Sequence, residues 1–222
     1  MLLGPLGSGK TLAGLQFVME GARGGETGLI TSFRESPERL LAKATAIGLA
    51  LDRQVAEGKI QMLWHPAREL LLDAWAHELL DRVAQLRPTR LVVDTLSDAQ
   101  FLVPDPARLP AFTTALVSAL AEFGVTTLLN AEPPTIVGGD LAVLLPPICG
   151  AVDTVVLLRY REHEDVLHRF VSMLRSGEGQ HDHAVRPFVI GDCGLEVPSA
   201  IAGAASSLGS DRPVAPIPAP PN

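Results

Sequence analysis

Residues 4–11, Gly4-Pro5-Leu6-Gly7-Ser8-Gly9-Lys10-Thr11, match the phosphate-loop pattern G-x-x-x-x-G-K-[ST] and lead directly into an amphipathic segment. The glycines allow backbone N–H groups to converge on a phosphate, and the positive end of the following helix points at the same anion. We expect Lys10 to neutralise the β- and γ-phosphates and the Thr11 hydroxyl to bind Mg²⁺, so the predicted ligands are ATP and Mg²⁺. The predicted nucleotide-binding residues are Gly4, Gly7, Ser8, Gly9, Lys10 and Thr11. The alternative is a glycine-rich turn before a helix.

The chain beyond this loop alternates between short apolar runs and helical periodicity. Strands are predicted over residues 28–33, 60–64, 90–94, 125–130, 154–160, 167–174 and 187–190. Helices are predicted over residues 11–20, from Ser36 onward, over 68–86 and over 108–123. Strands separated by helices predict right-handed βαβ crossovers, so we expect an α/β fold with a mainly parallel sheet flanked by helices. The charged turn between the strands at 154–160 and 167–174 predicts a C-terminal antiparallel hairpin added to that sheet.

The domain organisation is expected to be one domain and a tail. Residues 1–198 form the predicted domain, and residues 199–222 contain small residues and prolines without a large apolar face, which predicts a disordered tail. Only Met1, Leu2 and Leu3 precede the phosphate loop, whereas a strand typically has about five or six residues. We therefore expect a truncated first strand, in a chain that is a fragment or has a misplaced start.

Composition narrows the classes of function. The chain has 222 residues, of which 47% are hydrophobic and 19% charged, which indicates a packed domain and excludes wholesale disorder. The net charge of −7, with 15 Arg and three Lys, argues against a nucleic-acid partner. Two cysteines, Cys149 and Cys193, without a charged and apolar leader predict reduced core thiols in a cytoplasmic protein. No apolar run approaches the roughly 18 residues that a membrane-spanning helix needs.

A second metal ligand is predicted at the end of the strand at residues 90–94. This apolar run ends in Asp94, which follows the phosphate loop at a distance typical of the acid that holds Mg²⁺ through water. The alternative is a carboxylate that caps the next turn. Asp94 is therefore the metal-binding candidate that accompanies Thr11.

Polar residues after two other strands are candidates for the chemistry. Glu35 follows the strand at residues 28–33, where a carboxylate could orient the attacking water as general base; the alternative is a solvated acid beside the next helix. Asn130 and Glu132 end the strand at residues 125–130, where a polar group could sense the γ-phosphate; the alternative is a turn.

Three further features are interpreted as structural. His181-Asp182-His183 lacks a spaced second pair of ligands and is interpreted as a solvated loop rather than a metal site. Trp64 and Trp75 are interpreted as core residues.

An ordered set of segments extends well beyond the phosphate loop. GPLGSGKT is followed by EGARGGETGLITSFRESPERLLAKATAIGLALDRQVAEGKIQML, RLVVDTLSDAQ, FGVTTLLNAE, AVDTVVLLRY and HDHAVRPFVIGDCGLEV. This set, over about residues 2–197, resembles the KaiC family of RecA-like ATPases. The resemblance implies a RecA-type P-loop fold, ATP bound between subunits of a hexameric ring, and Lys10, Thr11 and Asp94 as phosphate and Mg²⁺ residues.

The chain departs from this family at three places. The family's two adjacent acids, the first being its base, correspond to Arg34-Glu35, which puts hydrolysis in doubt. The family's Lys-x-Arg-Gly segment corresponds to Arg175-Ser176-Gly177-Glu178, so the resemblance implies that Arg175 is the catalytic cation that reaches a neighbouring subunit's nucleotide; the alternative is a solvated Arg at a strand end. Cys149-Gly150 replaces the clock proteins' phosphorylated Ser-Thr pair, which excludes autophosphorylation there.

Four functions remain as alternatives. The preferred hypothesis is a slow KaiC-like ATPase, with Lys10, Glu35 and Arg175 as its catalytic residues, whose nucleotide state controls assembly or signalling with protein partners. The second is an ATP-binding interaction module without turnover, which Arg34 and Gly177 favour. A RecA-like DNA-associated motor lacks a basic, aromatic-interleaved stretch, and a P-loop kinase lacks a recognisable acceptor pocket or lid.

Overall fold

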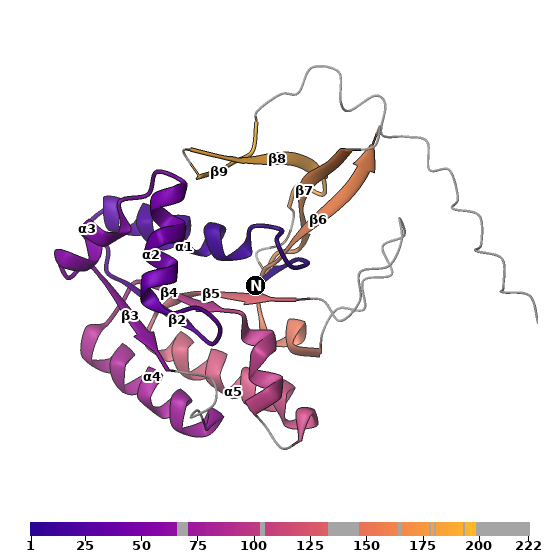
Figure 1. Cartoon of the computed structure of the whole chain (residues 1–222). Coiled ribbons are helices and arrows are strands. Elements are labelled where there is room, and N and C mark those ends of the chain that lie inside the picture. The colour runs from indigo at the N-terminus through magenta and orange to yellow at the C-terminus, as the bar shows by residue number, and fades with distance from the viewer. Residues whose placement is uncertain are drawn as a thin grey trace, which may run out of the picture.

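The computed structural model describes residues 1–65, 71–102, 105–132, 147–163, 166–177, 179, 181–192 and 194–198. Within these residues, nine strands form one sheet in the order β3-β2-β4-β5-β1-β6-β7-β8-β9 (Figure 1). The pairs among β3, β2, β4, β5, β1 and β6 are parallel, and the pairs from β6 to β9 are antiparallel. The predicted mainly parallel α/β fold with a C-terminal antiparallel hairpin is confirmed.

The bounds of the elements follow the sequence patterns closely. The strands are β1 (Leu2–Leu3), β2 (Gly28–Ser32), β3 (Ile60–Trp64), β4 (Arg90–Asp94), β5 (Thr126–Ala131), β6 (Val155–His163), β7 (Val166–Arg175), β8 (Arg186–Gly191) and β9 (Gly194–Glu196). The α-helices are α1 (Lys10–Arg23), α2 (Pro37–Ala46), α3 (Leu51–Ala56), α4 (Leu72–Leu86) and α5 (Leu109–Glu122). Short 3-10 helices cover Leu96–Leu102, Pro106–Arg108 and Pro147–Ala151.

The parallel strands are buried on both faces because successive side chains point to opposite sides of the sheet. Leu29 of β2 packs in a core with Leu79 of α4 and Leu116 of α5. Its neighbour Ile30 packs in a second core with Leu15 of α1, Leu40 of α2 and Leu51 of α3. Figure 1 shows the same division, with α1, α2 and α3 on one face and α4 and α5 on the other. This alternation explains why nearly continuous apolar runs mark these strands.

The position of β1 determines where the phosphate loop lies. This strand pairs in parallel with β5 on one side and with β6 on the other, so it lies in the interior of the sheet. The loop at residues 4–9 leaves its carboxyl end and leads into α1. Because the carboxyl ends of parallel strands meet at one edge of the sheet, residues that follow β2, β4 and β5 are brought to the same loop.

The C-terminal strands extend the sheet and return to α1. The hairpin of β6 and β7 pairs Tyr160 with Arg169, and β8 continues the antiparallel order. β9 then contacts α1, where the Gln16 side chain donates to the Leu195 carbonyl at 3.1 Å and accepts from the Leu195 N–H at 2.8 Å. This side-chain pairing anchors the end of the sheet to the helix that follows the phosphate loop.

Some expectations differ from the structure or fall outside its described residues. Trp75 is 3% exposed, which confirms it as a core residue, but Trp64 at the end of β3 is 36% exposed, so the core interpretation of Trp64 was wrong. The edge position of β3 explains this exposure. Helix α3 was not predicted. The expected tail at residues 199–222 and Cys193 lie outside the described residues.

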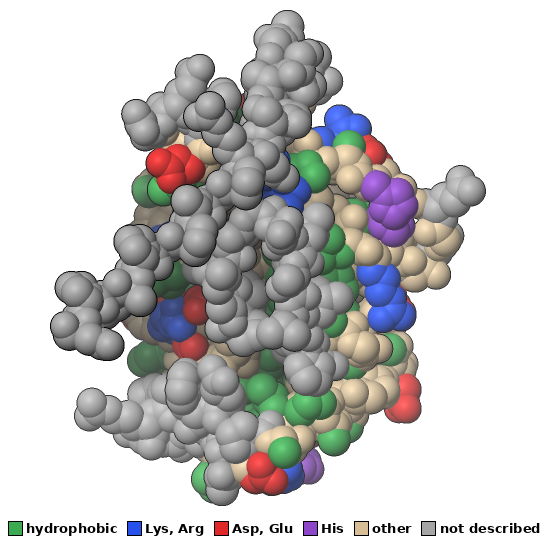
Figure 2. Space-filling model, turned by 90° about the vertical axis from the view of Figure 1, so that its right-hand side faces the viewer, with side chains coloured by type: hydrophobic (Ala, Val, Ile, Leu, Met, Phe, Trp, Pro, Cys, Tyr) green, Lys and Arg blue, Asp and Glu red, His purple; other side chains and the backbone are tan. Residues whose placement is uncertain are grey.

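The surface on the β6–β7 side shows charged side chains of both signs. Figure 2 shows Lys and Arg side chains at separate places on this face, interspersed with acidic and hydrophobic ones. Among the described residues, the structure contains no helix with the length and apolar character needed to cross a membrane.

Candidate nucleotide-binding site

The phosphate loop adopts a conformation that requires its glycines. Gly7 and Gly9 have φ angles of 77° and 103°, in the left-handed region that L side chains rarely adopt. A Cβ atom on Gly4 would lie 2.5 Å from the Ser8 Oγ, and one on Gly9 would lie 2.7 Å from the Ile190 Cδ1. The loop therefore fits closely between the end of β1 and strands β6 and β8.

Lys10 lies inside the curve of this loop. Its side chain is 7% exposed, and its Nζ donates to the carbonyl oxygens of Gly4 at 2.7 Å and Pro5 at 2.9 Å. Burial lowers the pKa of the Lys10 ammonium, and Glu132 and Asp94 act in the opposite direction. Ser8 is also buried, and its Oγ has no hydrogen-bond partner among the described residues. The loop thus holds a buried cation and an unpaired hydroxyl, which fit an anionic ligand.

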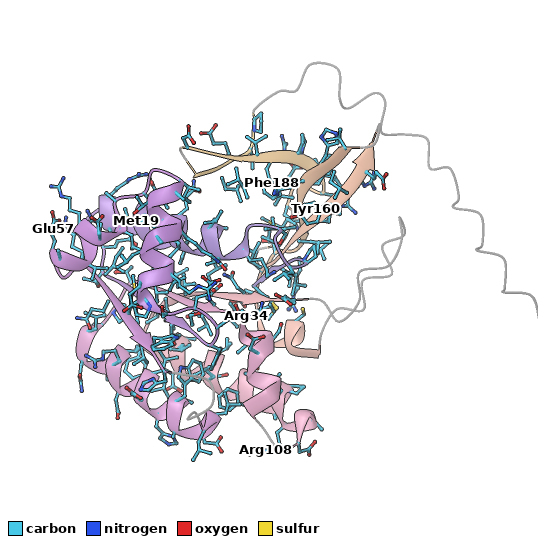
Figure 3. All side chains as sticks on the ribbon, viewed as in Figure 1. Met19, Arg34, Glu57, Arg108, Tyr160 and Phe188 are labelled. Carbon is cyan, nitrogen blue, oxygen red and sulfur yellow. The ribbon has the colours of Figure 1, made fainter. Side chains whose placement is uncertain are left out.

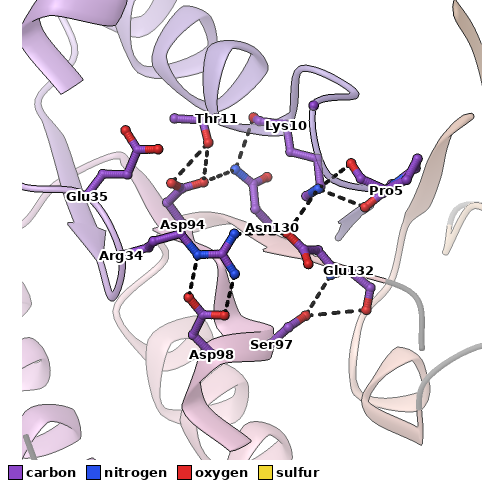
Figure 4. Close-up of polar contacts among 12 residues, drawn as sticks. Pro5, Lys10, Thr11, Arg34, Glu35, Asp94, Ser97, Asp98, Asn130 and Glu132 are labelled. Carbon is purple, nitrogen blue, oxygen red and sulfur yellow. Dashed lines mark hydrogen bonds and ion pairs between the residues drawn. The ribbon is translucent and has the colours of Figure 1, made fainter. Parts of the chain in front are cut away.

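Asp94 lies beside the phosphate loop, at the end of β4. Its carboxylate oxygens accept from the Thr11 hydroxyl at 3.2 and 3.1 Å, and one of them accepts from Asn130 Nδ2 at 2.8 Å (Figure 4). Asp94 is 2% exposed. Burial raises its pKa, while the hydrogen bonds from Asn130 and Thr11 lower it. The hydroxyl and the carboxylate are oxygen donors of the kind that Mg²⁺ prefers, so these two residues fit the predicted metal.

Asn130 connects this pair to the helix that follows the loop. Besides its bond to Asp94, its Nδ2 donates to the Lys10 carbonyl at 3.0 Å, and its side chain is buried. Asn130 therefore fixes the end of β4 against the first turn of α1. Sequence reasoning placed Asn130 at this edge, as a γ-phosphate sensor or a turn residue, but missed this positioning contact.

A cluster of four charged residues lies on the same side of the phosphate loop as Asp94 and Asn130. Arg34 donates to both carboxylate oxygens of Asp98, from Nε at 2.9 Å and from Nη2 at 2.7 Å (Figure 4). Its third contact is from Nη1 to Glu132 Oε1 at 3.3 Å, and the same oxygen lies 3.8 Å from Lys10 Nζ. Hydrogen bonds to Asp98 raise the pKa of Arg34. We call Lys10, Arg34, Asp98 and Glu132 the charged cluster.

Glu35 follows Arg34 but points to a different partner. Its Oε1 accepts from Lys43 Nζ of α2, and its backbone N–H donates to Ser32 Oγ at 3.0 Å. Glu35 is 9% exposed, and its Oε2 is buried without a hydrogen-bond partner among the described residues. The solvated-acid alternative was therefore wrong. Its role as general base stays a prediction.

A cavity of about 440 Å³ opens over the loop. One side is lined by Arg34, Glu35, Lys43, Thr95 and Glu132, and the other side includes Arg169 and Ile190. Figure 3 shows Tyr160 on the C-terminal strands and Arg34 away from them, in agreement with the strand order. The Tyr160 hydroxyl donates to the Gly7 carbonyl at 2.6 Å, and the Arg169 guanidinium lies 5.6 Å from the centre of the Tyr160 ring.

Sequence reasoning missed Tyr160 and Arg169. Both belong to the predicted hairpin, and their side chains share a face because they are cross-strand partners. The only signal in the sequence for a role of these two residues was that each is a polar side chain within a mostly apolar strand.

Arg175 lies at the other end of the hairpin. It pairs with Val155 at the start of β6, at the opposite edge of the sheet from the phosphate loop, and its Nη1 donates to the Cys149 carbonyl at 3.4 Å. The residue is exposed. The structure therefore does not bring Arg175 to the nucleotide site of its own chain. A Cβ on Gly177 would lie 2.9 Å from Asp153 Cβ, which explains the need for a small residue there.

The His181-Asp182-His183 segment shows local contacts. Asp182 accepts from Arg186, and hydrogen bonds from that side chain lower the pKa of Asp182. The rings of His181 and His183 have centres 4.3 Å apart. Over the described ranges, no group of three or more His, Cys, Asp or Glu side chains is arranged to hold a metal ion.

The mainly parallel sheet, the phosphate loop after its interior strand and the acid at the end of β4 define a RecA-like P-loop domain of the ATPase class. The family model described as the KaiC ATPase matches residues 1–200, so the chain belongs to the KaiC family.

Individual relatives agree with this assignment. The circadian clock protein KaiC3 of Synechocystis sp. is 27% identical over 197 residues, which cover 89% of this chain and 39% of that protein. The circadian clock oscillator protein KaiC of Thermostichus vulcanus is 23% identical over 194 residues, covering 87% of this chain and 37% of the relative. The chain thus spans about two fifths of the length of these curated relatives.

A solved structure shows the same fold. The crystal structure of a KaiC-like protein from the hyperthermophilic archaeon Pyrococcus horikoshii OT3 matches with a TM-score of 0.78 and 26% identity. The match covers 89% of this chain and 87% of that one.

Proposed function

We propose that this protein binds Mg-ATP at the phosphate loop, hydrolyses it slowly and uses the nucleotide state to control assembly or signalling. The observation that supports this most is the convergence of Lys10, Thr11 and Asp94 on one loop, with Ser8 Oγ buried and unpaired beside them. The KaiC family assignment supports the same ligand.

Each residue has a defined task in this proposal. The loop N–H groups and Lys10 bind the phosphates, and the carbonyls that hold Lys10 Nζ are exchanged for phosphate oxygens. Thr11 and Asp94 hold the metal, and Asn130 keeps Asp94 against α1. Mg²⁺, when bound, neutralises charge that develops on the phosphates.

Slow hydrolysis follows from the residues after β2. Glu35 accepts the proton of the attacking water through Oε2, which is buried and unpaired, while Lys43 holds Oε1. Arg34 occupies the position of the family's first acid and is paired to Asp98. The site therefore has one carboxylate where the family has two, and the remaining one is neutralised by a neighbouring ammonium.

Calorimetric titration with Mg-ATP tests the binding proposal. Lys10→Ala is expected to lower the affinity by roughly a hundredfold or more, because a buried cation that binds two phosphates is lost. Lys59→Ala is the matched control, since Lys59 pairs with Glu57 at the surface and lies outside the cavity. Equal affinities of wild type and Lys10→Ala would disprove the phosphate-loop proposal.

A second candidate is an ATP-binding module that does not hydrolyse ATP. The ion pairs of Arg34 with Asp98 and Glu132 favour it, because they place a cation where a base is expected. Measurement of phosphate release distinguishes the two candidates. Release that depends on the protein and is lost in Lys10→Ala supports the ATPase, and its absence in wild type that binds ATP supports the module.

We also propose that the protein assembles into a homo-oligomeric ring. Arg175 is exposed and does not line the cavity over its own phosphate loop, so a neighbouring subunit's nucleotide is the ligand that we propose for it. Light scattering after size-exclusion chromatography, with and without a slowly hydrolysed ATP analogue, is the test. ATP-dependent oligomers are expected for wild type and for the control Arg53→Ala but not for Arg175→Ala. Monomers of wild type under both conditions would contradict the ring.

A further inference from the structure

The carboxylate of Glu132 lies between two cations of the site. Its Oε1 is 3.3 Å from Arg34 Nη1 and 3.8 Å from Lys10 Nζ. Glu132 follows β5 directly, and its backbone N–H donates to Ser97 Oγ at 2.6 Å, which holds the backbone of Glu132 in place. A carboxylate oxygen between an ammonium and a guanidinium has the same charge and acceptor chemistry as a phosphate oxygen.

Arg34 is oriented for this contact by Asp98. The two bonds from Nε and Nη2 occupy one edge of the guanidinium, so Nη1 is left to face Glu132 and the cavity (Figure 4). A bidentate pair of this kind fixes the plane of the guanidinium as well as its position. Arg34 is thus held at the cavity wall by an acid that does not itself line the cavity.

The space between Lys10 and Arg34 lies where the outer end of a bound triphosphate is expected. Lys10 is the cation that contacts the β- and γ-phosphates in P-loop proteins. Arg34 and Glu132 line the cavity together with Thr11, whose hydroxyl donates to Asp94, and the metal and the terminal phosphate are expected there. Two anions cannot occupy the space between Lys10 and Arg34 at once, since like charges at contact distance repel strongly.

We propose that Arg34 is the cation with which this chain binds the γ-phosphate, and that Glu132 is an internal anion that the γ-phosphate displaces. The pair then determines how well the site distinguishes ATP from ADP. This inference rests on the proposed ATP binding and adds to it a specificity-determining function for two residues. It also assigns a function to Arg34, which stands at the position of the family's first acid.

The test is calorimetric titration of the full chain with Mg-ATP and with Mg-ADP. Glu132→Gln keeps the size of the side chain but removes the competing charge, so ATP affinity is expected to rise roughly tenfold and ADP affinity to change less than about twofold. Arg34→Gln is expected to lower ATP affinity roughly tenfold with little effect on ADP. Asp98→Asn is the control for orientation and is expected to give a smaller loss in the same direction.

The double variant Arg34→Gln/Glu132→Gln separates a direct pair from two independent effects. In the Arg34→Gln background, the gain in ATP affinity from Glu132→Gln is expected to be less than about half of the gain in wild type, because the effects of substitutions at contacting residues are not additive. Equal changes for ATP and ADP, or no change in either, would overturn the inference while leaving ATP binding intact. Absence of any nucleotide binding by wild type would instead overturn the proposed function and the inference together.

Discussion

The two sides of the phosphate loop differ in chemistry. On the β2–β4–β5 side, Asp94 accepts hydrogen bonds from Thr11 and Asn130, and the acids and cations of the charged cluster contact one another. On the β6–β7–β8 side, the contacts among the described residues include a hydrogen bond from the Tyr160 hydroxyl to the loop and the apolar side chains of Leu158 and Ile190 against Gly4 and Gly9, while the cation of Arg169 lines the cavity. A dense set of charges thus faces a sparse and partly apolar wall.

The strand order explains this difference. Because the loop follows β1, which lies between β5 and β6, one side of the cavity is formed by the ends of parallel strands and the other by an antiparallel extension. Acids at the ends of parallel strands suit a metal and terminal phosphates, which carry most of the ligand's charge. We expect the nucleoside end of a bound nucleotide to lie at the other wall. We therefore expect variants on the β2–β4–β5 side and variants on the β6–β7–β8 side to change different properties of nucleotide binding.

The largest effect is expected for hydrolysis at Glu35. Glu35→Gln removes the base that we propose, so turnover is expected to fall by a factor on the order of 10² or more, with ATP affinity unchanged within about twofold. Phosphate release measured at saturating Mg-ATP is the assay. Glu38→Gln in the first turn of α2 is the control, since Glu38 is exposed and lies outside the cavity. Equal turnover of wild type and Glu35→Gln would assign the water activation to another group.

The next effect concerns Asp94, which we propose as a metal ligand. Asp94→Asn is expected to lower the affinity for Mg-ATP roughly tenfold and to remove the dependence of ATP binding on Mg²⁺. Titrations with ATP in Mg²⁺ and in EDTA measure this dependence. A variant that keeps the full Mg²⁺ effect would show that Asp94 does not hold the metal.

The same variant gives a pH prediction for the protein without ligand. Burial raises the pKa of Asp94 in the folded chain above its unfolded value, so the folded chain binds this proton more tightly. The contribution of Asp94 to the free energy of unfolding therefore falls as pH rises from the ordinary carboxyl range through the raised pKa. Above that range, Asp94→Asn is expected to be more stable than wild type, as measured by urea denaturation; a less stable variant would contradict the desolvation argument.

A smaller effect is expected for Arg169 on the other wall. Its Nε is buried without a hydrogen-bond partner among the described residues, and its side chain lines the cavity. Arg169→Gln is expected to weaken ATP and ADP binding by the same factor, roughly threefold to tenfold, because both nucleotides share the nucleoside end. Arg161→Gln is the control, since Arg161 pairs with His168 on the other face of the hairpin. A loss confined to ATP would place Arg169 at the γ-phosphate and remove the contrast between the walls.

The smallest effect is expected for Tyr160. Tyr160→Phe removes the hydroxyl that donates to the Gly7 carbonyl but keeps the ring beside Arg169. The bond is exposed, so its loss is expected to cost about 1 kcal/mol or less, which is at most about fivefold in nucleotide affinity. Calorimetry with ATP and ADP measures the change. A loss above roughly thirtyfold would show that the hydroxyl holds the loop in its binding conformation.

The sequence by itself determined the fold class and the centre of the site. The phosphate loop at residues 4–11 is a local pattern whose spacing is set by one anion, so its meaning does not depend on distant residues. The strands were predictable because a buried parallel strand needs an apolar run, as at residues 90–94, and Asp94 was recognisable as the acid that ends it. Boundaries were less exact where tertiary contacts extend a helix or a strand, as in β6.

Only the tertiary structure decided which polar residues meet. Arg34 and Glu132 are separated by 98 residues and Tyr160 and Gly7 by 153, so no local pattern relates them. Each pair forms because the sheet order brings its strand ends to one edge, and the order of β5, β1 and β6 is set by packing over the whole domain. The carboxylate of Glu132 lies between Lys10 and Arg34 for the same reason. The sequence gives the charge of Glu132, but the packing of three strands against one loop determines which residues it contacts.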